Sequence, residues 1–233
     1  MISNKKDFSE FEKTIGVVFN DKDLLKQAFV HRSYLNEHKR FGISHNERLE
    51  FLGDAVLELV VTDFLYHKYT NKTEGDLTSY RSALVNTNSL AGVGEELGID
   101  GYLLLSKGEA RDTGRARSFI IANALEALIG AVYLDQGYTA AEQFIARVLF
   151  KRTEEIVEKR LWQDPKSLFQ EKAQDKSGVT PLYKSLRETG PDHDKQFVIG
   201  VFLGTEKIAE GQGKSKQEAE QDAAEAALAA RGW

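Results

Sequence analysis

The segment Phe119–Leu134, FIIANALEALIGAVYL, constrains the fold more than any other part of this chain. It lacks proline and is interrupted only by Asn123 and Glu126, which predicts a helix that is apolar on nearly every side. A helix of this kind is stable in water only when other elements surround it. We therefore expect the first part of the chain to be a helical domain built around residues 119–134.

The two polar residues of this segment are separated by three positions, so they share one face of the helix. Glutamate is almost never fully buried without a partner. One interpretation is that Asn123 and Glu126 are hydrogen-bonded to each other inside the core. The other is that they complete an acidic site whose remaining groups lie on a second helix.

The segment His45–Tyr66, HNERLEFLGDAVLELVVTDFLY, is a candidate for that second helix. It lacks proline, and its single glycine, Gly53, is tolerable in a helix of this length. Ser44 precedes Glu47 by three residues, which is the spacing of a capping box, so the helix is expected to begin at about Ser44. Its apolar side chains are expected to point toward the core, namely Leu49, Leu52, Val56, Leu59 and Val60.

Three carboxylates follow the opposite side of this helix. At roughly 100° per residue, Glu47, Glu50 and Asp54 fall within an arc of about 60°. Carboxylates this close repel each other and have raised pKa values unless a cation neutralises them. Hard divalent cations such as Mg²⁺ bind oxygen ligands of this kind. The alternative is that the three groups form an ordinary solvated acidic face.

Composition excludes several classes of chemistry. The chain has no cysteine, which excludes disulfides, cysteine-ligated zinc and a cysteine nucleophile. Its N-terminus has no apolar leader, and we expect no membrane span and a cytoplasmic location. The net charge of −5 means that any binding of a polyanion must depend on local basic patches.

Residues 1–158 are thus predicted to form an all-α domain, with residues 106–117 as an exposed, arginine-rich loop. Besides the two helices above, helices are expected over Phe8–Ile15, Lys22–Phe29 and Thr139–Val157. A further helix is expected to begin after an N-cap at Asp76 and to continue through Leu90–Leu97.

The pattern changes after a linker at residues 159–164. Residues 165–233 are predicted to form a separate α+β domain with the order α-β-β-β-α. Its strands are expected at Pro181–Thr189, Gln196–Leu203 and Glu206–Gln212, between helices at Lys166–Asp175 and Ser215–Ala230.

The residues His45–Asp54, HNERLEFLGD, resemble the signature segment of the ribonuclease III family. The segments HRSY (His31–Tyr34), EGDLT (Glu74–Thr78) and ALEALIGAVYLDQG (Ala124–Gly137) also stand in the order found in that family. The C-terminal part resembles a double-stranded-RNA-binding domain in its first helix, in GPDH (Gly190–His193) and in GKSKQEAEQDAA before the last helix. Together these resemblances cover about 220 of the 233 residues.

The resemblance implies an enzyme that uses Mg²⁺, with Mn²⁺ as a substitute, to hydrolyse both strands of double-stranded RNA. Ribosomal-RNA precursors and messenger RNA are the implied substrates, and the products would carry 5′-phosphates and short 3′ overhangs. The family works as a homodimer, for which we expect Phe51 to lie at the interface. Its position near the acidic residues would be unusual for a core side chain, although packing within one subunit is the alternative.

The resemblance also assigns roles in the acidic site. Glu50, Asp54 and Glu126 would hold the essential metal, with Asp54 and Glu126 as the catalytic pair. Glu47 and Glu74 would support the site. Asn123 stands where well-studied members carry a metal-binding aspartate, so its uncharged amide predicts weaker metal binding and a higher Mg²⁺ requirement. The alternative function is a non-cleaving double-stranded-RNA-binding protein whose catalysis is lost through Asn123.

In the second domain, the resemblance assigns RNA contacts to Gln170, Glu171 and His193. Such domains recognise the shape of the A-form minor groove. Lys214 and Lys216, before and within the last helix, would bind phosphate with help from the helix dipole, unless they form only a solvated helix end. The family often has further basic residues after Lys216, where this chain has Gln217 and Glu218. Fewer phosphate contacts predict weaker binding with a shallower salt dependence.

Overall fold

The computed structural model describes residues 7–160, 162–191 and 195–233. The chain forms two compact units, Met1–Trp162 and Gln163–Trp233, and each is described by itself.

The first unit is helical, as predicted, apart from an isolated bridge between Val30 and Leu104. Short 3₁₀ turns lie at Ile99–Tyr102, Glu109–Arg111 and Phe150–Arg152. Its helices are α1 (Phe8–Ile15), α2 (Lys22–Ala28), α3 (Arg32–Glu37), α4 (Glu47–Lys68), α5 (Glu74–Val85), α6 (Thr87–Glu96), α7 (Arg115–Gln136), α8 (Tyr138–Leu149) and α9 (Thr153–Glu158).

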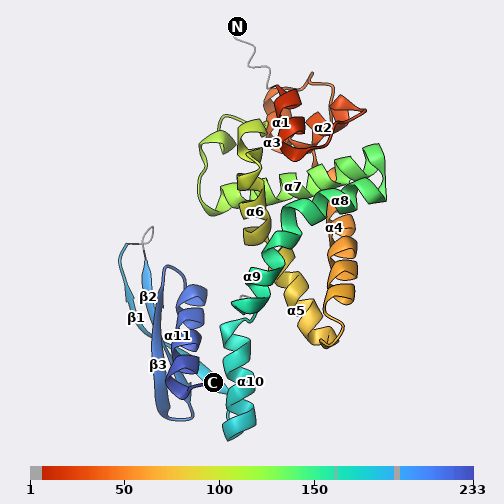
Figure 1. Cartoon of the computed structure of the whole chain (residues 1–233). Coiled ribbons are helices and arrows are strands. Elements are labelled where there is room, and N and C mark those ends of the chain that lie inside the picture. The colour runs from red at the N-terminus through yellow and green to blue at the C-terminus, as the bar shows by residue number, and fades with distance from the viewer. Residues whose placement is uncertain (1–6, 161, 192–194) are drawn as a thin grey trace. The chain divides into compact units, whose positions relative to one another are not determined.

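Helix α7 is the centre of this unit, and α4 crosses it (Figure 1). Its residues from Ile120 to Val132 are buried with the exceptions of Asn123 and Glu126, which are partly exposed. By length and composition α7 alone among the described helices could cross a membrane, whereas no membrane span was expected from the sequence. However, 56% of its most apolar 18-residue stretch is buried inside the protein, which is typical of a core helix. The expectation of a core helix here is confirmed.

The start of α4 differs from the expected one. The helix begins at Glu47, and its N-cap is Asn46 in place of Ser44. The Asn46 side-chain amide donates a hydrogen bond to the carbonyl oxygen of Ala28 at 3.1 Å and so does not cap the helix. This contact between residues 18 positions apart could not be read from the local spacing. The expected capping box is therefore wrong.

A capping box does form at α5, where Thr73 is the N-cap and Asp76 is the third residue of the helix. The expected N-cap at Asp76 is therefore displaced by three residues. Asn86 ends α5 in an extended conformation and caps α6, so the expected continuation is a separate helix. In the same way, the segment expected as one helix over 139–157 is divided between α8 and α9. Helix α7 also begins at Arg115, inside the segment expected as a loop.

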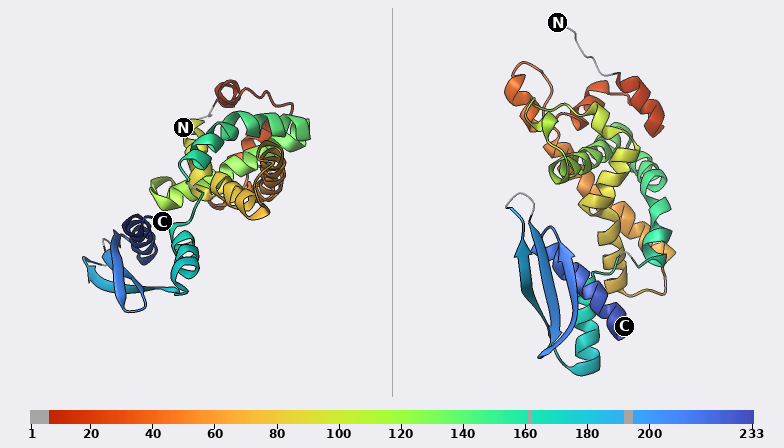
Figure 2. Two further views of the ribbon diagram at one scale, coloured as in Figure 1. Left: turned by 60° about the horizontal axis from the view of Figure 1, so that its bottom comes forward. Right: turned by 90° about the vertical axis from the view of Figure 1, so that its left-hand side faces the viewer.

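The second unit has the predicted α-β-β-β-α order, and the predicted fold class is confirmed. It comprises α10 (Pro165–Ser177), β1 (Pro181–Thr189), β2 (Gln196–Leu203), β3 (Glu206–Gly213) and α11 (Lys216–Arg231). The strands form one antiparallel sheet in the order β1-β2-β3. Helix α11 lies along the sheet (Figure 2), and the core of this unit contains Phe169, Val201, Ala223, Ala224 and Ala227.

Candidate active site

The acidic residues of α4 and α7 meet where the two helices cross. A methyl group added to Gly53 of α4 would lie 1.8 Å from the backbone carbonyl oxygen of Glu126 of α7. Glu50 and Asp54 flank this glycine in the sequence. The close packing of the two backbones therefore brings Glu50, Asp54 and Glu126 to one place, as the interpretation of an acidic site requires.

The electrostatics of Glu126 reflect this proximity. Burial raises the pKa of its carboxyl group to about 7, and the negative charges of Asp54 and then Glu50 add to the shift. The pKa of Glu50 is also raised, first by burial and then by the charges of Glu47 and Asp54. Negative charges this close to Glu50 and Glu126 disfavour the ionised forms of both carboxyl groups.

None of these three carboxylates has a hydrogen-bond or ion-pair partner among the residues that the structure describes. The cluster formed by Glu50, Asp54 and Glu126, called the acidic cluster below, thus carries uncompensated negative charge. Asn123 lies one helical turn before Glu126 on α7 and is also partly buried. Its position three residues before Glu126 places its amide on the same side of α7.

Glu47 and Glu74 differ from the acidic cluster because they have partners. The Glu47 carboxylate lies 3.6 Å from the Arg32 guanidinium and 3.7 Å from Nδ1 of His45. The Glu74 carboxylate, at the start of α5, accepts a hydrogen bond from the Thr78 hydroxyl at 3.0 Å. Glu47 contributes to the raised pKa of Glu50, whereas Glu74 is not among the charges that shift Glu50 or Glu126.

The chemistry of the acidic cluster fits a hard divalent cation. In the described part of the chain, no three His, Cys, Asp or Glu side chains are already grouped closely enough to enclose an ion. The available ligands are nevertheless oxygen atoms of unpaired, crowded carboxylates beside an amide, which is the ligand type of Mg²⁺. A divalent cation would remove the repulsion that raises the pKa values of Glu50 and Glu126.

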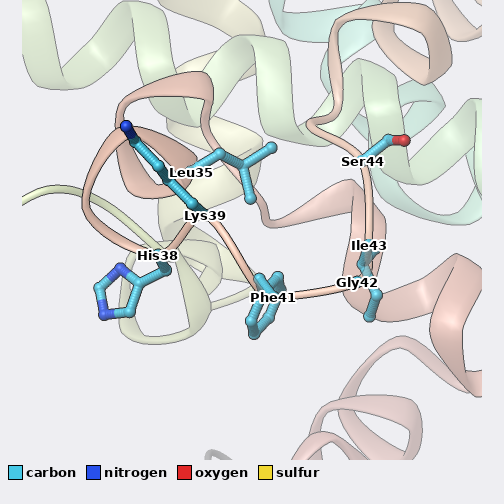
Figure 3. A pocket seen from close by; sticks show the side chains of 7 residues that line it. All are labelled: Leu35, His38, Lys39, Phe41, Gly42, Ile43 and Ser44. Atoms are coloured by element: carbon cyan, nitrogen blue, oxygen red, sulfur yellow. The ribbon is translucent and has the colours of Figure 1, made fainter.

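A hollow of about 430 Å³ lies beside the segment that leads into α4 (Figure 3). His38, Lys39 and Phe41 are among the residues that line it, and the rings of Tyr34 and His38 stack at 3.9 Å. No member of the acidic cluster lines this hollow. The chemistry of the carboxylates is thus located at the helix crossing, outside the hollow.

The exposed side of α4 carries three large apolar side chains. Phe51 is 80% exposed, Leu59 58% and Tyr66 67%. The expectation that Leu59 points into the core is therefore wrong. At about 100° per residue these three side chains lie within an arc of about 80° along the helix. We call them the α4 stripe. A helical-wheel count that included all three would have found it.

In the second unit, Gln170 and Glu171 are exposed on α10, and Lys214 and Lys216 are exposed at the start of α11. The Lys216 ammonium group lies over the Phe197 ring at 5.7 Å. The backbone N–H of Lys214 donates to the Glu218 carboxylate at 2.9 Å, so an acidic side chain already occupies this helix end. His193, which was also expected to bind RNA, lies outside the described residues.

In comparisons with known proteins, the helical unit and the α-β-β-β-α unit match two different families. Residues 21–153 match the family model described as ribonuclease-III-like, and residues 165–230 match the double-stranded RNA binding motif. Ribonuclease 3 of Enterococcus faecalis is 46% identical over 220 residues, covering 94% of this chain and 95% of its own. Ribonuclease 3 of Borreliella burgdorferi is 43% identical, covering 97% of this chain and 92% of its own.

A solved structure provides a third comparison. The nuclease domain of ribonuclease III from Campylobacter jejuni is 39% identical, with a TM-score of 0.57. The match covers 62% of this chain and 97% of that domain, which was described for structural flexibility in a region involved in dimer formation. The helical unit therefore has a solved relative of the same architecture.

Proposed function

The chain belongs to the ribonuclease III family, and from this premise we propose how it cleaves RNA. It is an endoribonuclease that acts on double-stranded RNA. The proposal is that residues 1–158 carry the cleavage site, residues 165–233 bind the duplex, and residues 159–164 link them. The observation that supports this most is the acidic cluster, which lies in the ribonuclease-III-like segment and has no neutralising partner in the described part of the chain.

The family uses divalent metal ions, and the proposed ion here is Mg²⁺, with Mn²⁺ as a substitute. Glu50, Asp54 and Glu126 would hold it, with Asp54 and Glu126 as the catalytic pair. When bound, such ions lower the pKa of a water nucleophile and stabilise charge on the phosphoryl oxygens. With a pKa of about 7, Glu126 is partly protonated at neutral pH, and this proton competes with metal binding.

The other site residues have supporting roles in this proposal. Asn123 offers an amide oxygen but no charge, so a higher Mg²⁺ concentration is required for the same occupancy. Glu47 and Glu74 orient the surroundings of the site. The ion pair of Glu47 with Arg32 leaves its carboxylate less available to a metal than the unpaired carboxylates are.

We further propose that the protein acts as a homodimer, so that two sites cut the two strands. The α4 stripe supports this, because three large apolar side chains on one exposed helix face form a surface that favours burial by a partner. Phe51 is the most exposed of them. The products would carry 5′-phosphates and short 3′ overhangs. The proposed location is cytoplasmic, with ribosomal-RNA precursors and messenger RNA as substrates.

The α-β-β-β-α unit binds duplex RNA through its shape. The proposed contacts are Gln170 and Glu171 on α10, His193, and the lysines at the start of α11. Lys214 and Lys216 would meet phosphate, while Glu218 at the same helix end opposes this and weakens the overall affinity. The expected salt dependence is accordingly shallow.

A cleavage assay across a Mg²⁺ series tests the proposal. The full chain is incubated with a labelled RNA hairpin and, separately, with a single strand of the same length. Cleavage of the hairpin alone is expected. The Asn123→Asp variant is expected to reach half-maximal cleavage at a lower Mg²⁺ concentration because it adds a charged ligand.

Three results would contradict parts of the proposal. Binding of the hairpin without cleavage at every Mg²⁺ concentration would refute catalysis and favour a binding protein. Equal cleavage of the single strand would refute duplex specificity. An unchanged Mg²⁺ requirement in Asn123→Asp would show that the amide at this position does not limit metal binding.

A further inference from the structure

Helices α4 and α7 touch through a reciprocal pair of glycines. A methyl group on Gly53 would lie 1.8 Å from the carbonyl oxygen of Glu126 and 2.8 Å from the backbone nitrogen of Gly130. A methyl group on Gly130 would in turn lie 2.2 Å from the carbonyl oxygen of Leu49 and 3.1 Å from the backbone nitrogen of Gly53. Each glycine thus faces the backbone of the opposite helix.

These obstacles cannot move independently of their helices. Side-chain β-carbons essentially never approach another heavy atom more closely than 3.0 Å. Alanine at position 53 therefore requires a displacement of at least 1.2 Å (3.0 minus 1.8), and alanine at position 130 one of at least 0.8 Å (3.0 minus 2.2). Because backbone carbonyls in a helix are hydrogen-bonded and rigid, the displacement must separate the two helices.

The crossing point coincides with the acidic cluster. Glu50 stands three residues before Gly53, and Asp54 follows it directly. Glu126 takes part in both the helix contact and the acidic cluster. Its backbone carbonyl oxygen packs against Gly53, and the pKa of its carboxyl group is raised by the charges of Asp54 and Glu50. A separation of the helices at Gly53 would therefore move Glu126 away from the carboxylates of α4 by a similar distance.

We propose that Gly53 and Gly130 are positioning residues for the metal site, since their contact sets the distance between the carboxylates of α4 and that of α7. The inference rests on the proposed function and adds the device that maintains the site. Mg²⁺ requires near-ideal octahedral geometry with ligands at about 2.0–2.1 Å, and functional groups must be held to within about 0.5 Å. A separation of 0.8–1.2 Å exceeds that tolerance.

A third tight glycine in the same unit supplies the matched control. A methyl group on Gly94 of α6 would lie 2.4 Å from Cγ2 of Ile121 on α7. This contact also joins a helix to α7 and is equally buried in the core. It involves no member of the acidic cluster. Gly94→Ala should therefore reproduce the loss of packing without the loss of ligand geometry.

The experiment compares the full-length Gly53→Ala, Gly130→Ala and Gly94→Ala variants. Circular dichroism and thermal unfolding identify a temperature at which each is folded. Mn²⁺ binding without RNA is then measured by the loss of the free-ion signal in electron paramagnetic resonance, and hairpin cleavage in Mg²⁺ is measured in parallel. Both alanine variants at the crossing are expected to bind Mn²⁺ at least tenfold more weakly, whereas Gly94→Ala binds it like the unmodified protein.

Gly130→Ala, with the smaller displacement, keeps the test decisive if Gly53→Ala does not fold. A folded crossing variant that binds Mn²⁺ with unchanged affinity would overturn the inference, and so would an equal loss in Gly94→Ala. Failure of the unmodified protein to bind Mn²⁺ would overturn it as well, because there would be no site to position. If the unmodified protein binds Mn²⁺ but does not cleave the hairpin, the proposed function fails while the comparison of Mn²⁺ affinities still decides the inference.

Discussion

Replacing Glu126 with glutamine should stabilise the metal-free protein above pH 7 and leave its stability nearly unchanged below pH 4.5. Burial, followed by the charges of Asp54 and Glu50, raises the pKa of Glu126 from 4.5 to about 7 in the folded protein. The folded state therefore retains a proton that the unfolded state releases. The resulting stability is present below pH 4.5 and is lost as the pH rises to about 7.

The size of the effect follows from the shift. A change of about 2.5 pKa units corresponds to about 3.4 kcal/mol at 1.36 kcal/mol per unit. Because Glu126 is only partly buried, we expect about 2–3 kcal/mol in practice, since solvent screens part of the repulsion. For a unit of this size the melting temperature changes by about 2–4 °C per kcal/mol. The variant should thus melt roughly 4–12 °C higher at pH 8 in the absence of metal, on the same scale.

The assay is thermal unfolding in a chelator from pH 4.5 to pH 8.5, and the informative quantity is the difference between the two proteins. This difference cancels the contribution of His31, whose pKa is lowered by burial and whose effect on stability has the opposite sign. Glu95→Gln is the control, because Glu95 is an exposed carboxylate of α6 without an ion-pair partner in the described residues. Adding Mg²⁺ at pH 8 should stabilise the unmodified protein more than Glu126→Gln.

Two results would refute this reasoning. A difference in melting temperature that does not change with pH would show that Glu126 ionises in the folded state as it does in the unfolded chain. A Glu126→Gln variant that is less stable at pH 8 would show that the carboxylate has a stabilising partner. In either case the three carboxylates would not form an uncompensated cluster.

Three further changes test other parts of the molecule. Phe51→Ala should shift the protein from dimer toward monomer in analytical ultracentrifugation, because it deletes the most exposed apolar ring of the proposed interface. An unchanged dimer would show that Phe51 does not contribute to the interface. Lys216→Ala should weaken duplex binding and reduce the slope of log affinity against log salt by about one, whereas an unchanged slope would exclude a phosphate contact. Tyr183→Phe should be neutral or stabilise the second unit by up to about 1 kcal/mol in urea unfolding, because burial and the charges of Glu220 and Asp164 raise the pKa of this tyrosine to about 12 and its buried hydroxyl has no hydrogen-bond partner in the described structure.

Sequence patterns predicted most of the helices and all three strands because local periodicity and turn residues determine them. Phe8–Ile15 and Pro181–Thr189 have the bounds expected from the sequence. The displaced N-cap of α5 has a local cause, the capping box of Thr73 with Asp76, whereas the start of α4 was mispredicted because a distant residue intervenes. Asn46 bonds to Ala28 and so displaces the expected cap of α4, and no local signal contains that contact.

Helical periodicity also predicted which residues form the acidic cluster. It did not predict how closely the two helices approach each other. Helical spacing places Glu50 and Asp54 on one side of their helix. Glu126 was identified because a glutamate is almost never buried in a core without a partner. The closeness of the two helices depends on Gly53, which local reasoning could only describe as tolerable in a helix. Its importance is apparent only when the backbone of Glu126 is seen against it.

Asn123 connects the stability of the site with its affinity for metal. An acidic cluster without a cation destabilises the folded state, and a fourth carboxylate one turn from Glu126 would increase the repulsion. Under the proposed function, the uncharged amide would reduce this destabilisation of the metal-free protein and would also lower its affinity for metal. Asn123→Asp should accordingly melt lower than the unmodified protein in a chelator at pH 8, yet gain more on addition of Mg²⁺. If it melts at the same temperature in the chelator, the side chain at position 123 does not share the electrostatic environment of Glu126, and the proposed effect of Asn123 on the Mg²⁺ requirement would lose its electrostatic basis.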